Sequence, residues 1–190
     1  MKILSFHTFF WLVGLIVPLA INAQDTNSTT QEVSLQVAGS ALLSIYGPPV
    51  VLKLAGASEA GDSISTNAEN NLTRLRISSL VNNEELRNIT AKLSDALVGT
   101  QLSVELKSPN SNFVFPQFKG NLMGAKVLSN ESDSKLVEGI GTCWSGKGED
   151  DGYVIEYKFG VIPGASILKS TDISITYTIS TVPSDGSSGN

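Results

Sequence analysis

The sequence predicts an all-β protein, an antiparallel two-sheet β-sandwich, from three observations. Apolar and polar residues alternate with a period of two in several segments, which turns one face of each segment inward. Clusters of Gly, Asn, Asp, Ser and Pro separate these segments at short intervals. No long run shows the apolar spacing of three and four that is typical of a helix. A closed antiparallel barrel is the alternative fold, because alternation alone does not distinguish the two.

The strands are predicted from this alternation and from enrichment in β-branched and aromatic residues. In chain order they cover residues 33–37, 41–45, 50–54, 74–80, 88–93, 102–106, 136–140, 153–159 and 173–179. The last two show the clearest alternation. Turns are predicted at Asn70-Asn71, at residues 108–110 and at residues 150–152.

The N-terminal residues have the layout of a signal peptide. Lys2 precedes an apolar run over residues 9–17, and the small residues Ala20 and Ala23 place the cleavage site before Gln24. The run is shorter than the roughly 20 residues that span a bilayer, so a retained membrane anchor is the weaker interpretation. We therefore expect a secreted or cell-surface protein after removal of residues 1–23.

One domain is expected in the mature chain, because its length fits a single hydrophobic core. The predicted organisation is a polar tail at 24–31, a β-sandwich at 32–181 and a flexible tail at 182–190. Lys2 is the only charge in the signal peptide, so 13 − 1 = 12 basic groups face 18 acidic groups, a net charge of −6. This balance argues against nucleic acid as a partner, and no second apolar stretch predicts a membrane span in the mature chain.

The residue composition argues against an enzyme. The single histidine, His7, lies in the signal peptide, so the mature chain has no imidazole for nucleophilic triads or for most zinc sites. A carboxylate pair acting on glycosides is the remote alternative, although Glu105, Glu138 and Glu156 are predicted on outward, solvated strand positions. The single cysteine, Cys143, excludes an intramolecular disulfide and is predicted to be buried and inert.

Aromatic residues gather in two neighbouring segments. Phe113, Phe115 and Phe118 surround Pro116 in an otherwise polar stretch, and Trp144 follows Cys143. Packing against the core is the favoured interpretation, and a surface for a glycan or protein partner is the alternative.

Two further patterns have simple alternatives. Glu149, Asp150 and Asp151 could supply oxygen ligands to calcium, but three adjacent acids between strands are typical of a solvated hairpin tip. We therefore expect no cofactor. Asn-x-Ser/Thr sequons occur at Asn27, Asn71, Asn88 and Asn130, and the sequence does not indicate which are used.

The C-terminal strands carry a resemblance to known proteins. Tyr153-Val154-Ile155-Glu156-Tyr157, followed by the alternation of residues 172–179, resembles the closing strands of secreted bacterial sandwiches of the fimbrial-subunit, spore-coat-U-like and WxL-like families. The resemblance implies a non-enzymatic extracellular role in adhesion or assembly. It carries over no site residues.

The function expected from the sequence is therefore structural or adhesive. Protein partners or a second copy would join at a strand edge, with Gln31 to Val37 as a candidate donor strand, although the same segment fits an ordinary first strand. The alternative function is a carbohydrate-binding module that uses the aromatic segments.

Overall fold

The computed structural model describes residues 31–82, 85–108 and 113–182. Internal contacts divide the chain into two units, Met1–Leu35 and Gln36–Asn190, and every described strand belongs to the second. The predicted signal peptide lies outside the described residues, as do both predicted tails except for Gln31 and Val182.

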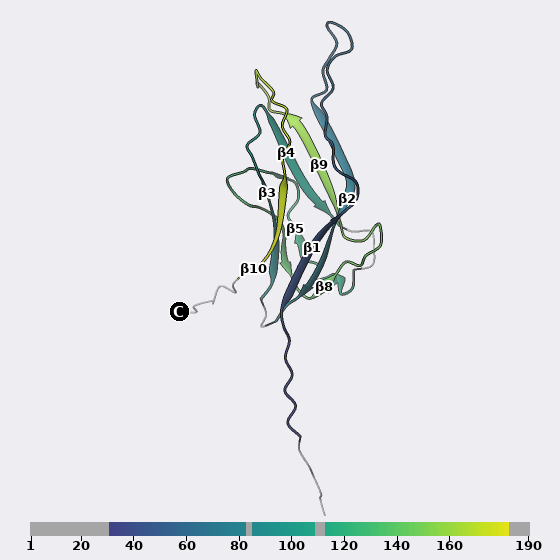
Figure 1. Cartoon of the computed structure of the whole chain (residues 1–190), viewed down its shortest axis with the longest axis vertical. Coiled ribbons are helices and arrows are strands. Elements are labelled where there is room, and N and C mark those ends of the chain that lie inside the picture. The colour runs from purple at the N-terminus through teal and green to yellow at the C-terminus, as the bar shows by residue number, and fades with distance from the viewer. Residues whose placement is uncertain (1–30, 83–84, 109–112, 183–190) are drawn as a thin grey trace, which may run out of the picture. The chain divides into compact units, whose positions relative to one another are not determined.

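The second unit is an antiparallel two-sheet β-sandwich, as predicted (Figure 1). The larger sheet has the order β1 (Ser40–Tyr46), β2 (Asn67–Leu80), β9 (Tyr153–Val161), β4 (Thr100–Lys107) and β6 (Lys126–Val127), and β8 (Cys143–Trp144) pairs with the end of β2. The smaller sheet has the order β10 (Ile175–Thr181), β3 (Arg87–Leu93), β7 (Ser134–Ile140) and β5 (Asn121–Leu122). A single 3-10 turn, η1, spans Pro116–Phe118 in the described part of the chain.

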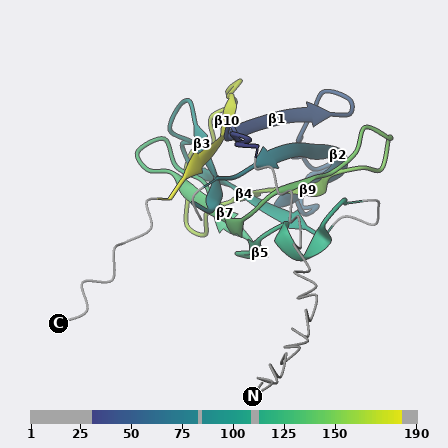
Figure 2. The same cartoon turned by 90° about the horizontal axis from the view of Figure 1, so that it is seen from below.

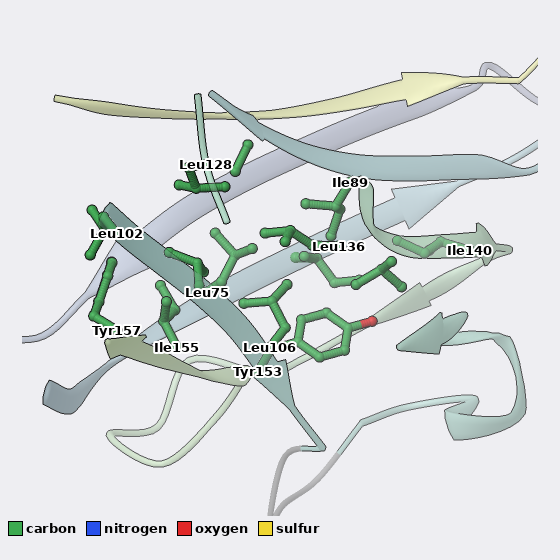
Figure 3. Close-up of a cluster of buried hydrophobic side chains, with 14 of the residues drawn as sticks. Leu75, Ile89, Leu102, Leu106, Leu128, Leu136, Ile140, Tyr153, Ile155 and Tyr157 are labelled. Atoms are coloured by element: carbon green, nitrogen blue, oxygen red, sulfur yellow. The ribbon is translucent and has the colours of Figure 1, made fainter. Parts of the chain in front are cut away.

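The core lies between the sheets and is built from alternate residues of each strand. Leu75 of β2 and Ile155 of β9 are fully buried, and they face Ile89 of β3 and Leu136 of β7 across the interior (Figure 3). Full burial of such a side chain stabilises the fold by about 1.5–3 kcal/mol. Tyr153 and Tyr157 of β9 also point inward, and the buried Tyr153 hydroxyl donates a hydrogen bond to the Lys119 carbonyl.

The predicted strand at residues 33–37 is wrong. The described residues before Ser40 form no strand, and Val33, Leu35 and Val37 are 67%, 88% and 58% exposed. Alternation predicts which face would be buried, but it does not supply the neighbouring strand that a ladder requires.

The predicted strand at residues 50–54 is also wrong. Val50 and Leu52 pack against the core from a loop, so their alternation reflects side-chain packing without backbone pairing. Similarly, Ile173 packs from a loop, and the last strand begins at Ile175 rather than at residue 173.

The predicted turn at Asn70-Asn71 is instead an irregularity within β2. Pairing with β9 shifts register between Asn70 and Thr73, and the Asn70 side chain accepts a hydrogen bond from the Leu72 N–H at 3.1 Å. The side-chain oxygen replaces a ladder acceptor, so the strand continues through a sequence that is typical of turns. The predicted turn at residues 108–110 lies outside the described residues after Ser108.

Candidate functional site

The aromatic segment and β8 run side by side. The Val114 N–H donates a hydrogen bond to the Trp144 carbonyl at 3.0 Å, and the Gly141 N–H donates one to the Phe118 carbonyl at 2.9 Å. These two bonds hold residues 113–118 against residues 141–144. The aromatic residues that the sequence singled out, Phe113, Phe115, Phe118 and Trp144, are thereby brought to one region of the fold.

Phe113 belongs to the core, not to a surface. It is 8% exposed, and its ring centroid lies 5.3 Å from that of Tyr153. The packing prediction is therefore confirmed for Phe113. Phe118 remains on the surface above Gly141, where there is no side chain to cover it.

Phe115 and Trp144 form an exposed aromatic pair. Their rings meet edge to face at 5.4 Å and 89°, and they are 46% and 41% exposed. Cys143 points into the core, so the next residue along the strand, Trp144, points to the outer face of the larger sheet. An edge-to-face pair of this kind contributes about 0.5–1.5 kcal/mol beyond its buried area.

The backbone of Phe115 is strained. Its φ of 58° and ψ of 58° lie in the left-handed region, where Phe115 is the one described residue other than glycine. Bulky side chains rarely adopt this region, and the following Pro116 restricts Phe115 further. Strain of this kind costs on the order of 1–3 kcal/mol and is concentrated at ligand-binding sites.

The outer face beside Trp144 carries polar and cationic groups. Ser78 pairs with Trp144 on one side and with Leu42 on the other. Arg76 lies two residues along β2, with its guanidinium carbon 3.8 Å from the centroid of the Tyr46 ring, and it donates a hydrogen bond to the Gly148 carbonyl at 2.6 Å. Its charge is thus held in one place by a ring and a carbonyl.

The acidic turn does not bring its three carboxylates together. Asp151 is buried and accepts a hydrogen bond from the Gly148 N–H at 2.6 Å, while Asp150 forms an ion pair with Arg74 at 3.6 Å. No group of three or more Asp, Glu, Cys or His residues within the described ranges is arranged to hold a metal ion. The geometry gives the turn a role in loop structure: a side chain at Gly146, whose φ is +87°, would overlap the Asp151 carboxylate.

A carboxylate pair forms where the sequence did not indicate one. Glu105 and Glu156 lie opposite each other on β4 and β9. Lys107 lies 2.7 Å from Glu105 and 3.9 Å from Glu156, and Lys158 lies 3.0 Å from Glu156. The hydrogen bond from Lys158 lowers the pKa of Glu156, whereas a general acid for glycoside hydrolysis requires a raised pKa.

Cys143 is a buried free thiol, as predicted. Burial raises its pKa to about 11, so the thiolate that would react or form an intermolecular disulfide is suppressed at neutral pH.

The sequons differ in accessibility. Asn88 is buried, and its side-chain oxygen accepts a hydrogen bond from the Gly139 N–H at 3.2 Å, so a glycan there would disrupt the β3–β7 contact. Asn71 is exposed and Asn130 is half-buried, whereas Asn27 lies outside the described residues.

The comparisons with known proteins found no relative, so the function is inferred from the fold and the site geometry. Within the part of the chain that the structure describes, no helix is long and apolar enough to cross a membrane. No protein-family model matches the chain, and no curated protein matches its sequence.

Proposed function

We propose that this chain is a non-enzymatic, secreted or cell-surface module with a structural or adhesive role, and that it associates with a second copy through the free edges of β1 and β10. The observation that carries the proposal is a pair of long, uncharged edge strands. β1 and β10 have seven residues each and contain no charged side chain. Both pair with their inner neighbours without a register shift.

The other two edges are protected in the usual way. β5 and β6 have two residues each, and β6 contains a lysine. Short strands and charges discourage pairing with another chain, whereas long, regular, uncharged edges invite it. β1 and β10 also lie beside each other, so both unprotected edges are on one side of the sandwich (Figure 2).

This side is also where the core is incompletely covered. Leu43 of β1 and Ile175, Tyr177 and Ile179 of β10 pack against the core but remain half-buried, and Ile45 is 53% exposed. An added strand would form ladder hydrogen bonds with one of these edges and cover these side chains.

The candidate donor is the segment from Gln31 to Val37. Its apolar residues alternate and are exposed, and the described residues before Ser40 form no ladder with another strand. Each apolar side chain that becomes buried at an interface would contribute up to about 1.5–3 kcal/mol before the cost of association is subtracted.

The first experiment measures the solution mass of the exported protein by light scattering over a wide concentration range, with and without calcium. Growth of the mass with concentration is the expected result. The N-terminus of the exported chain should be Gln24, which peptide sequencing checks. A constant monomer mass at all concentrations would overturn the association proposal.

Matched charge variants then locate the contact. Ile45→Lys places a charge on the inner face of the edge and should abolish association. Leu35→Lys should do the same if the donor is residues 31–37, while Gln36→Lys adds the same charge on the opposite face and should associate normally. If Leu35→Lys still associates and Ile45→Lys does not, the β1 edge is kept as the contact and residues 31–37 are excluded as the donor.

A further inference from the structure

A row of aromatic, cationic and hydroxyl side chains crosses the outer face of the larger sheet from β8 to the edge strand β1. Trp144, Ser78 and Leu42 share one rung across β8, β2 and β1. Arg76 faces the same way two residues further along β2, and Tyr46 lies on the rung beyond it. With a rise of about 3.3 Å per residue, the row extends roughly 13 Å, which is longer than a single sugar ring.

Arg76 is positioned in advance of any ligand. The Tyr46 ring lies against its guanidinium, and the Gly148 carbonyl engages one of its nitrogens. No carboxylate of the described residues forms an ion pair with Arg76, although Arg74 is paired with Asp150. A guanidinium has five N–H donors, and within the described ranges only one hydrogen bond from Arg76 is formed, although its Nε is buried. Binding through a side chain that is already held loses little conformational entropy.

The strained backbone of Phe115 is an independent indication of function at the same place. The fold holds this residue at φ 58° next to Trp144, with a large part of its ring exposed to solvent. Phe115 is 46% exposed, so only about half of the residue is buried to offset this strain. The strain is consistent with a ring held in position for a ligand.

We infer that the face formed by Trp144, Phe115, Arg76 and Tyr46 binds a neutral polysaccharide. Sugar rings combine apolar C–H faces, which stack on aromatic rings, with a rim of hydroxyls that require hydrogen-bond partners. Trp144 supplies the ring, and Ser78 and Arg76 supply polar groups beside it. A protein partner would favour a more continuous apolar centre, which Ser78 interrupts.

The local charges balance, which suits a neutral ligand. Asp150 offsets Arg74 directly. Glu149 and Asp150 line an open groove of about 570 Å³ together with Tyr46 and Arg74. Arg74 and Arg76 together balance Glu149 and Asp150, so this face has no net charge to attract an anionic chain, whereas a neutral chain needs only hydrogen-bonding groups and the exposed rim of Tyr46.

The experiment uses the exported protein, in which Trp144 is the only indole once residues 1–23 are removed. The probes are soluble neutral polysaccharides (a β-glucan, a xylan and a galactomannan) and one polyuronate. Binding is followed by indole fluorescence and by retardation in gels that contain each polysaccharide. We expect binding to at least one neutral polysaccharide with a shift in Trp144 emission, and no tighter binding to the polyuronate.

Variants test whether this face is the site. Trp144→Ala and Phe115→Ala should each weaken binding, measured by gel retardation, by roughly tenfold or more, as expected for a truncated aromatic anchor. The control is Ile167→Ser, which also removes an exposed apolar side chain and should bind normally. Ile167 lies beside Gly99 at the start of β4, whereas Ser108 and Lys119, next to the aromatic segment, lie at the other end of that strand. Thermal unfolding verifies that each variant is folded.

Three outcomes would overturn the inference: no binding to any of the polysaccharides, binding that the folded Trp144→Ala variant retains, or tighter binding to the polyuronate than to every neutral chain. Because Trp144 lies on the face of the sheet and not on the β1 or β10 edge, Trp144→Ala should leave the light-scattering mass unchanged. Failure of this inference is thus distinguishable from failure of the edge association.

Discussion

Ile155 and Ile179 face the same core from strands in different positions. Ile155 lies on β9, which has a strand on each side, and is fully buried, whereas Ile179 lies on the edge strand β10 and is half-buried. The same contrast separates the central strands β2, β4 and β9 from the edge strand β1. A strand covers the core fully only where neighbours on both sides cover its own side chains, so the β1/β10 side of this sandwich is the incomplete one.

The largest expected effect comes from removing side-chain volume at these two positions. Ile155→Ala should lower the free energy of unfolding by about 2–5 kcal/mol, because the cavity it leaves is enclosed on all sides. Ile179→Ala should cost clearly less, since solvent already reaches that site. Urea unfolding of the two variants measures the difference. Equal losses would show that the two sides are equally closed.

A smaller effect is expected from a hydroxyl on the closed side. The Ser145 hydroxyl is fully buried and accepts a hydrogen bond from the Ile77 N–H at 3.0 Å. Ser145→Ala leaves that N–H without its acceptor and should cost about 1–3 kcal/mol in urea unfolding. Ser78→Ala changes an exposed hydroxyl next to Ile77 on β2 and should lower the free energy of unfolding only slightly. If the two variants have the same stability, water must replace the lost acceptor.

The buried thiol predicts a pH dependence. Burial raises the pKa of Cys143 from its ordinary value of 9.0 to about 11 in the folded protein, so between these values the folded state keeps a proton that the unfolded state has lost. Stability should therefore fall as pH rises from about 9 to 11. Cys143→Ser should flatten this part of the pH profile, with the other titrating groups unchanged. A profile of the same slope for both proteins would contradict the assignment.

The smallest effect is expected on the open side. Ile45→Lys replaces a side chain that is already more exposed than buried, so the monomer should lose no more than about 0.5–1 kcal/mol in urea unfolding. A larger loss would mean that Ile45 already contributes to a closed core and that the β1 edge is not free.

The sequence was most informative about properties that depend on one strand alone. Alternation predicted that Tyr153 and Tyr157 face inward, and the small buried thiol of Cys143 was predicted from its apolar surroundings and the absence of a nearby base. These properties depend on the period of the strand and on local chemistry, so they follow from a few neighbouring residues.

Features that depend on register were not predictable. Glu105 meets Glu156 because β4 pairs with β9 in one register, and a shift of one residue would separate them. Arg76 reaches Tyr46 for the same kind of reason. The segment at residues 33–37 has the pattern of a strand but no ladder in the described structure, since pairing is a property of two segments and its sequence specifies only one.

The place of β9 in the chain also governs the order in which the protein can fold. β9 lies between β2 and β4 in the larger sheet, yet it follows both in sequence by many residues, and β10, the partner of β3, comes later still. Until residues 153–181 are available, β2 can pair only with β1 and the short β8, and β3 only with β7, so each keeps most of one edge exposed and competent to pair. A chaperone that binds extended apolar segments should therefore hold the nascent chain until β9 and β10 are available and release it only then.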